Sequence, residues 1–245
     1  MGNDSKKLTG RVDPGRIAML EVPRPPQGVV ERFMRLSDPS STVSDVMDEM
    51  GLPSGAIGAS VLRPTIAGKV VVGPALTMRN AIQGIDALAG AQKHVNRMGE
   101  FEAHNLALPG DVLVCEGVAD VSNMGGISSR LAQRQGEAGA VIMGGVRDVA
   151  YSRSIGFPIW ASDYTPVTGK WRIETMEING PVTMGNARVM PGDLVVADDT
   201  GICFIPRAVI MQVLEAAEKQ TAFEEERSAQ IEAGLPITEF GPRPH

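Results

Sequence analysis

The sequence contains little cysteine, histidine or aromatic side chain. Of 245 residues, two are cysteine and three are histidine, and aromatic residues make up 4%. His94, His104 and His245 are too few and too widely spaced along the chain for a three-ligand imidazole zinc site. Cys115 and Cys203 lie inside apolar, strand-like runs, which predicts buried free thiols rather than metal ligands.

Long apolar runs and an excess of positive charge are also missing. No apolar stretch is long enough to span a bilayer. The opening MGNDSKKLTG is not typical of a signal peptide, and Lys6 stands where N-myristoylation requires serine or threonine. The net charge of -6 argues against nucleic acid as a main partner, because phosphate binding needs a basic face. We expect a cytoplasmic protein that binds neither membranes nor nucleic acid.

What remains is the composition of an ordinary soluble domain, with 43% apolar and 21% charged residues. Strand-like and helix-like segments alternate in the middle of the chain, and strands cluster late. This order predicts an α/β or α+β layered domain, most simply a single one. The predicted strands cover 69–79, 110–117, 140–145, 157–162, 181–184, 187–190, 194–197 and 202–205. The predicted helices cover 29–36, 41–51, 84–98, 125–139, a short segment from 148, and 206–233.

Local signals fix some of these boundaries. Thr42 and Asp45 have the spacing of a capping box at the start of the second helix, and Gly51 suits its left-handed end. Pro206 is favoured in the first turn of the last helix. Gly73 and Pro74 interrupt the first long strand and predict a bulge or bend there.

A glycine-bearing loop, VADVSNMGG, follows the strand at 110–117 and opens a helix at Ile127. Gly125 and Gly126 keep side chains off the loop, so a ligand can approach the amides of Gly126, Ile127 and Ser128. These amides are the unpaired donors of a helix N-terminus and favour a carboxylate. The alternative is that the glycines serve the geometry of a tight turn alone.

The next strand ends in GGVRD, where Arg147 stands beside Asp148. Ligands of parallel sheets collect beyond the carboxyl ends of strands, so this pair and the glycine loop are expected at one edge. Neighbouring side chains at a strand-to-helix turn diverge, so the pair suits two parts of one ligand better than a mutual ion pair. Arg147 can clamp an anion, and Asp148 can hold a hard cation. The alternative is that Asp148 caps the next helix and Arg147 is solvated.

These residues resemble a known family. Gly126, twenty further residues and then Arg147-Asp148 form the G-x20-R-D spacing typical of RraA-like proteins and of class II 4-hydroxy-4-methyl-2-oxoglutarate (4-carboxy-4-hydroxy-2-oxoadipate) aldolases. TVSDVMDEMG, GPALTMR, PGDVLVCEG and PGDLVVADDTGICFIPR are similar to further segments of that family. The similarity covers residues 40–235, which leaves 1–39 as an N-terminal arm and 236–245 as a tail.

The resemblance implies an αββα layered sandwich that assembles as a homotrimer or a homohexamer, with active sites between subunits. It implies that Asp148 anchors Mg²⁺ or Mn²⁺ largely through waters, that Arg147 contacts the substrate, and that amides of the glycine loop hold the pyruvyl carboxylate. The substrate-binding set is then Gly125, Gly126, Ile127, Ser128 and Arg147.

The resemblance also implies an acidic residue that reaches the site from the C-terminal helix of the next subunit. Glu224 is the preferred candidate, as a metal-binding and catalytic residue, and Glu225 is a second possible metal ligand. Both could equally belong to a solvated helix face. One departure concerns Gly126, because the aldolases carry there an aspartate that handles a proton. Glu116, at the end of the preceding strand, is a candidate to replace it.

Two functions from different classes follow. The leading hypothesis is a divalent-metal-dependent carbon–carbon lyase that releases pyruvate from a 2-oxo acid, by retro-aldol cleavage of a 4-hydroxy-2-oxo acid, by decarboxylation of oxaloacetate, or by both. The alternative is a non-catalytic regulator of the RraA type that binds a ribonuclease. Asp198 and Asp199 invite a paired-carboxylate interpretation, but ADDTG is typical of a hairpin turn and we favour the turn.

Overall fold

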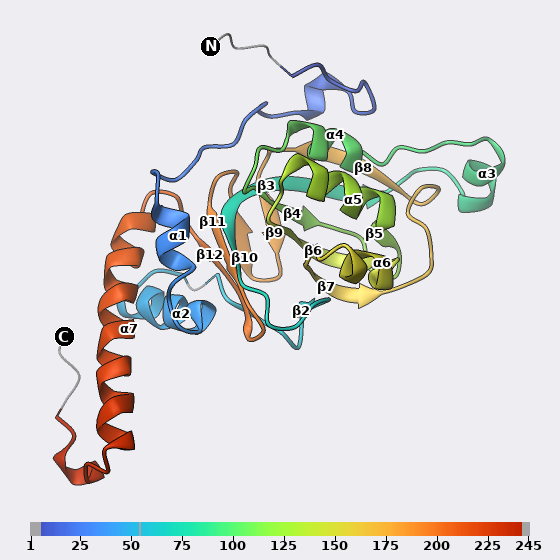
Figure 1. Cartoon of the computed structure of the whole chain (residues 1–245). Helices are drawn as coiled ribbons and strands as arrows, with labels where there is room; N and C mark the ends of the chain where they lie inside the picture. Colours follow the sequence, from blue (N-terminus) through green and yellow to red (C-terminus); the bar gives the residue numbers. More distant parts are fainter. Residues whose placement is uncertain (1–5, 54, 242–245) are drawn as a thin grey trace.

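The described residues fold around a mixed sheet of ten strands. A computed structural model describes residues 6–53 and 55–241, and Figure 1 shows helices on both sides of the strands. Neighbouring strands follow the order β1-β12-β11-β3-β4-β6-β7-β2, with β5 paired to β6 and β8 paired to β3. A separate two-stranded ribbon is formed by β9 and β10.

The centre of the sheet is parallel and its edges are antiparallel. The parallel strands are β3 (Val71–Ile82), β4 (Val112–Glu116), β5 (Ser122–Met124), β6 (Gly139–Val146) and β7 (Ile159–Tyr164). They are rich in valine, isoleucine and leucine because both faces of a parallel sheet are covered. The other strands are β1 (Ile57–Gly58), β2 (Arg63–Pro64), β8 (Ile173–Ile178), β9 (Val182–Met184), β10 (Ala187–Val189), β11 (Leu194–Ala197) and β12 (Gly201–Ile205).

Helices α4 (Glu100–Leu106), α5 (Gly126–Gln135) and α6 (Val149–Ser154) lie on one face of the parallel strands (Figure 1). Ala103 of α4 and Ala132 of α5 are fully buried in a core with Leu113 and Ile142 of the sheet. This core holds α4 and α5, the two helices that border the candidate site, against the sheet. The sheet therefore sets where the side chains of both helices lie at the site.

Two further cores complete the layers. On the other face of the parallel strands, Val141 and Trp160 pack with the β9–β10 ribbon and with Phe204 of β12. Beyond these antiparallel strands, α1 (Val29–Phe33), α2 (Pro39–Glu49) and α7 (Ile210–Glu232) form the third core with Ile205. The ten-stranded sheet thus forms two packed layers, the parallel strands and the antiparallel strands around β11 and β12, and helices cover the outer face of each layer. The predicted α/β class and αββα layering are confirmed.

Several predicted details are also confirmed. Gly51 has φ +65 just after α2, the left-handed conformation that ends a helix. Asp198 lies in the turn between the antiparallel strands β11 and β12, where its carboxylate accepts the amide of Thr200 at 2.8 Å. The hairpin interpretation of ADDTG is therefore right.

Other boundaries were wrong. Within 84–98 only α3 (Ala87–Gln92) is helical, and α4 and β8 were not predicted. The capping box fails because α2 begins at Pro39, so that Thr42 lies inside the helix and donates to the Ser37 carbonyl. The last helix begins at Ile210 rather than at Pro206. The β-bulge in β3 lies at Arg79/Asn80. At Gly73–Pro74, where a bulge or bend was predicted, β3 changes its pairing partner from β11 to β4.

Residues 6–18 lie beside α4 and β8, where Figure 1 shows them in dark blue, and the chain then runs on to α1. The Thr9 amide donates to the Glu102 carboxylate at 2.9 Å, and the Arg11 guanidinium lies 4.9 Å from the centre of the Phe101 ring. Arg24 forms an ion pair with the buried Asp111 at 2.5 Å. The first part of the predicted arm therefore contacts the helix that borders the candidate site.

No helix among the described residues is long and apolar enough to cross a membrane.

Candidate active site

A small pocket lies beyond the carboxyl ends of β5 and β6, at the edge predicted for a parallel sheet. Its volume is about 130 Å³. The glycine loop and the Arg147–Asp148 turn, 20 residues apart in the chain, both line it. The predicted site residues on its wall are Gly125, Gly126, Ile127, Ser128, Arg147 and Asp148.

Glycines allow the loop and the strand to approach each other here. A Cβ at Gly145 would lie 2.6 Å from the Val121 carbonyl oxygen, and a Cβ at Gly144 would lie 2.5 Å from Asn123 Nδ2. The buried Asn123 side chain donates to the carbonyls of Val118 and Val121, and so holds the loop in place. The two glycines before Arg147 thus serve loop packing.

Asp148 has a left-handed backbone, with φ 57 and ψ 34, which turns its carboxylate back toward the glycine loop. Oδ2 accepts the amide of Gly126 at 2.8 Å and lies 3.5 Å from Nε of Arg147. The expectation that Arg147 and Asp148 would diverge was wrong, because this conformation brings the two side chains together. Asp148 occupies the N-cap position of α6 without a side-chain capping bond there.

The bond from Gly126 also changes the anion site. One of the three first-turn amides of α5 is satisfied by Asp148, which leaves those of Ile127 and Ser128 without a backbone or side-chain partner in the described part of the chain. These two amides and the positive end of the helix dipole still favour a carboxylate. The site therefore offers two amides and one guanidinium to an anionic ligand.

The donor set fits a single hydrated divalent cation. In the described ranges no three histidine, cysteine, aspartate or glutamate side chains lie close enough to hold a metal ion by themselves. Mg²⁺ is commonly bound through one or two carboxylates, with water and substrate oxygens as its other ligands. The Asp148 side chain is 48% exposed, so water can reach it. One carboxylate at an accessible pocket is compatible with this mode of binding.

Helix α4 adds a residue that the sequence did not reveal. Glu100 lines the pocket, and its Oε2 atom is buried without a hydrogen-bond partner among the described residues. Burial raises the pKa of Glu100 above its usual 4.5, against the nearby charges of His104, Arg11 and Lys170. Lys170, which also lines the pocket, was missed as well. No sequence signal separates Glu100 from an ordinary acidic residue in a first helical turn.

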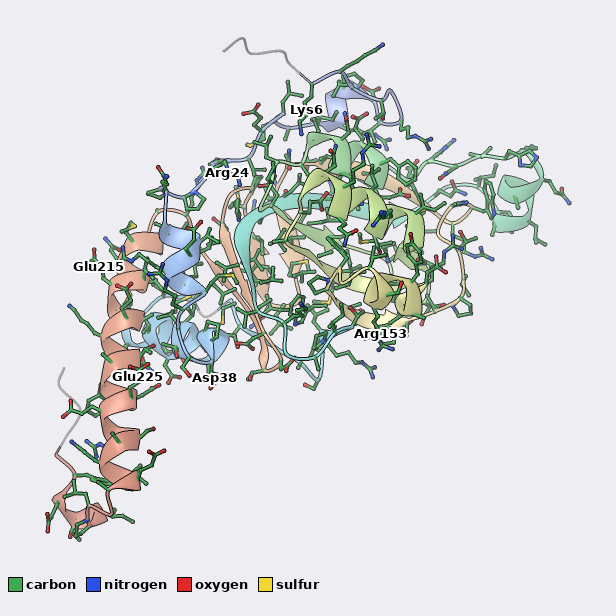
Figure 2. All side chains as sticks on the ribbon, in the orientation of Figure 1. Lys6, Arg24, Asp38, Arg153, Glu215 and Glu225 are labelled. Carbon is green, nitrogen blue, oxygen red and sulfur yellow. The ribbon has the colours of Figure 1, made fainter. Side chains whose placement is uncertain are left out.

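Glu224 and Glu225 do not reach this pocket within one chain. Both are exposed on the outer half of α7, and Glu224 accepts a hydrogen bond from Gln220 at 2.8 Å. In Figure 2, Glu225 lies far from Arg153 of α6, the helix that begins just after Asp148. Glu116 also points elsewhere, because its carboxylate accepts the amide of Thr183 at 2.6 Å. Glu116 therefore does not replace the missing aspartate in this arrangement.

A wider hollow of about 730 Å³ adjoins the small pocket and shares Gly126, Ile127 and Asp148 with it. The Ile127 side chain is 75% exposed in this hollow. The other residues that line the wide hollow are Arg130, Leu131, Arg134, Ala150 and Tyr151. An exposed apolar surface with two arginines beside a candidate site is typical of a surface that meets another molecule.

The two cysteines take no part in this site. Cys115 and Cys203 are free and buried, as predicted. Burial raises the pKa of Cys203 to about 12 and raises that of Cys115 as well. Both thiols are therefore protonated near neutral pH and are poor nucleophiles.

Replacing Glu100 with glutamine is expected to raise the midpoint of thermal unfolding near pH 7. The raised pKa of Glu100 in the folded protein means that its contribution to stability is fully present below pH 4.5 and is lost as the pH rises. Glutamine resembles the protonated acid and removes this loss. Thermal unfolding followed by circular dichroism from pH 4 to 8 should show a difference that grows with pH.

Glu102→Gln on the same helix is the matched control with the opposite sign. Burial raises the pKa of Glu102, but hydrogen bonds from Thr9 and Asn105 outweigh this effect and lower it. Its stabilising contribution is present above its unfolded pKa and is lost as the pH falls. Glu102→Gln should therefore lower the unfolding midpoint near pH 7. Equal responses of the two variants would contradict the assigned environments.

Comparisons with known proteins identify the family of this chain. The family described as RraA-like: Aldolase/RraA matches residues 40–204. A protein of Halalkalibacterium halodurans, provisionally named 4-hydroxy-4-methyl-2-oxoglutarate aldolase, is 31% identical over 195 residues, which are 79% of this chain and 84% of that protein.

Solved structures are similar over most of the chain. Streptomyces coelicolor RraAS2, described as an unusual member of the RNase ES inhibitor RraA protein family, is 30% identical with a TM-score of 0.69, and the match covers 84% of this chain and 98% of that one. An uncharacterized protein from Pseudomonas syringae pv. tomato shares the fold at 20% identity, with a TM-score of 0.73 and coverage of 89% and 98%. The chain belongs to the Aldolase/RraA family.

Proposed function

We propose that this protein is a divalent-metal-dependent carbon–carbon lyase that releases pyruvate from a 2-oxo acid. The observation that carries the proposal is the joint placement of Arg147, Asp148 and the first turn of α5 around one small pocket. Drug-sized ligands occupy pockets of roughly 300–1,000 Å³, so a pocket of about 130 Å³ favours a much smaller acid. The similarity to a protein named as an aldolase supports the reaction class.

The protein groups divide the work of binding. The amides of Ile127 and Ser128, with the positive end of the α5 dipole, hold the substrate carboxylate. The Arg147 guanidinium contacts substrate oxygens and offsets the negative charge that develops as the bond breaks. Lys170 adds a second positive charge at the same wall.

Asp148 would hold the cation, Mg²⁺ or Mn²⁺, with waters as additional ligands. When bound, such an ion polarises the 2-oxo group and stabilises enolate charge. Glu224, with Glu225 as the second candidate, would approach from a neighbouring copy of the chain in a trimer or hexamer. The exposed apolar hollow beside Asp148, with its arginines Arg130 and Arg134, suits contact with an acidic helix.

The experiment that tests the proposal measures pyruvate release. Purified protein should convert oxaloacetate, 4-hydroxy-4-methyl-2-oxoglutarate or both to pyruvate when Mg²⁺ or Mn²⁺ is present. Excess EDTA should remove the activity, and added metal should restore it. Spontaneous metal-catalysed decay of oxaloacetate without protein is the background to subtract.

A second candidate function is regulation of a ribonuclease without catalysis. The match to RraAS2, described within an RNase ES inhibitor family, favours it. A docking surface does not require Arg147 and Asp148 together at a pocket, which weighs toward the lyase. No turnover of any tested 2-oxo acid, together with ribonuclease binding that survives Asp148→Asn, would replace the lyase by the regulator.

A further inference from the structure

A buried chain of three polar side chains runs from the protein interior to the small pocket. Nδ1 of His104 lies 2.7 Å from Oε1 of Glu137, and Nε2 of the same ring lies 2.7 Å from Oγ of Ser128. The side chains of His104 and Glu137 have no exposed surface, whereas Ser128 lines the pocket. An ionised carboxylate only accepts hydrogen bonds, so Nδ1 carries a hydrogen and Nε2 can exchange a proton with Ser128.

Stability alone does not account for this arrangement. Oε2 of Glu137 is buried without a hydrogen-bond partner among the described residues, and an unpaired buried oxygen costs free energy. Replacing a buried ion pair by apolar residues of similar volume is often neutral or stabilising. An acid that orients a histidine, which in turn bonds to a hydroxyl at a pocket wall, is the arrangement that activates a hydroxyl for proton transfer.

Resting on the proposed function, we infer that Ser128 transfers the proton of the aldol cleavage and that His104, oriented by Glu137, stores it. Gly126 offers no side chain for proton transfer, so another group on the pocket wall has to handle the proton. Gly126 cannot take a larger side chain without displacement, because a Cβ there would lie 3.1 Å from Tyr151 Cδ1 and 3.3 Å from Asp148 Oδ2.

One proton is taken from the C4 hydroxyl oxygen and one is delivered to C3, so the enzyme ends the cycle in its starting state. Ser128 Oγ accepts the proton of the C4 hydroxyl while its own proton moves to Nε2 of His104. The C4–O bond becomes a carbonyl, the C3–C4 bond breaks, and its electron pair enters the enolate of C2 and C3. Nε2 then returns its proton to Oγ, and Oγ protonates C3 to give pyruvate. Protons and electrons balance, and no other reactant is needed.

The surroundings of His104 suit this storage. Burial lowers the pKa of His104, whereas the carboxylates of Glu137 and Glu100 raise it, and the net direction is above the usual 6.5. Glu137 faces the ring from the turn between α5 and β6, and Glu100 faces it from the same helix, α4. Arg11 and Lys170 act on Glu100 in turn. The imidazolium formed during cleavage is therefore stabilised by adjacent negative charge.

Exchange of the methyl hydrogens of pyruvate in D₂O isolates this step, because it needs proton transfer at C3 but no cleavage of a carbon–carbon bond. Proton NMR with Mg²⁺ present should show loss of the methyl signal with the wild-type protein. Ser128→Ala should slow the exchange by about 100-fold, the lower end of general acid–base effects. Ser128→Thr should retain most of it, and oxalate affinity by calorimetry should stay near wild type in both variants.

Ser152→Ala is the matched control. Ser152 is a buried helical serine whose Oγ donates to the Val149 carbonyl at 3.0 Å, and it does not line the pocket. Exchange should be unchanged in this variant. His104→Gln tests the positioning residue: the wild-type rate should fall as the pH drops through the pKa of His104, and this acidic limb should disappear in the variant.

The outcomes separate the two proposals. Exchange at the wild-type rate in Ser128→Ala, with pyruvate release intact in the wild-type protein, overturns the relay alone. Loss of exchange in Glu100→Gln under those conditions assigns the proton to Glu100 instead. Absence of both exchange and pyruvate release in the wild-type protein overturns the lyase and the relay together.

Discussion

Replacing Asp148 with asparagine is expected to lower metal-dependent release of pyruvate from oxaloacetate by about 100-fold or more, the size of effect seen when one electrostatic contact to the transition state is lost. Asparagine tolerates the left-handed backbone at this position, and its side-chain oxygen can still accept the Gly126 amide. The variant removes the negative charge that would hold a divalent cation and leaves the loop in place. A coupled assay of pyruvate with lactate dehydrogenase measures the effect.

Asp120→Asn is the matched control for this prediction. Asp120 is exposed, has φ 61 and lies in the loop after β4, but it does not line the small pocket. The same chemical change in the same backbone conformation should leave activity unchanged. Full activity of Asp148→Asn, or equal loss in both variants, would remove Asp148 from the proposed cation site.

A mixture of two inactive variants is expected to recover activity. Glu224→Gln should lower turnover strongly because it removes the carboxylate that the neighbouring chain supplies to the site. Asp148→Asn should lower turnover because it removes the carboxylate that the pocket's own chain supplies. In co-expressed mixed oligomers, some sites combine an intact Asp148 with an intact Glu224 from another chain. Random pairing makes this about a quarter of the sites. The prediction follows from the separation of two helices within one chain, because Glu225 of α7 lies far from Arg153 of α6 (Figure 2).

Differently tagged chains, purified through both tags in succession, provide the mixed oligomers for the assay. Glu232→Gln, at the exposed end of the same helix, serves as the control and should retain full activity. Recovery only in the mixture assigns Glu224 to a neighbouring chain. Full activity of Glu224→Gln alone rejects its role, and a mixture that stays inactive rejects the exchange of residues between chains.

The sequence predicted the parts of this molecule that depend on short-range pattern. Apolar β-branched runs marked the central strands, and the hairpin residues of ADDTG marked the β11–β12 turn. The loop that ends at Gly126 and the pair Arg147–Asp148 were expected at one sheet edge because parallel strands place their carboxyl ends together. The positions of these groups followed from topology, and the structure places them on one pocket wall.

The parts that were missed depend on tertiary packing. Glu100 and His104 belong to a helix whose sequence, EFEAHNL, is equally suitable for a solvated surface. Their proximity to Ser128 exists because α4 packs on α5, which no local spacing encodes. The contact between Arg147 and Asp148 was missed for a conformational reason. Few non-glycine residues adopt a left-handed backbone, and no residue in GGVRD indicates this conformation at Asp148.

The tether between Thr9 and Glu102 has a consequence for comparing relatives. Residue 9 precedes the segment 40–204 that defines family membership, yet it bonds to the helix that carries Glu100 and His104. Two homologues with identical pocket walls but unrelated leading tracts would hold that helix differently. Differences in catalysis between members of the family could then originate in the segment before the part of the chain that the family match covers.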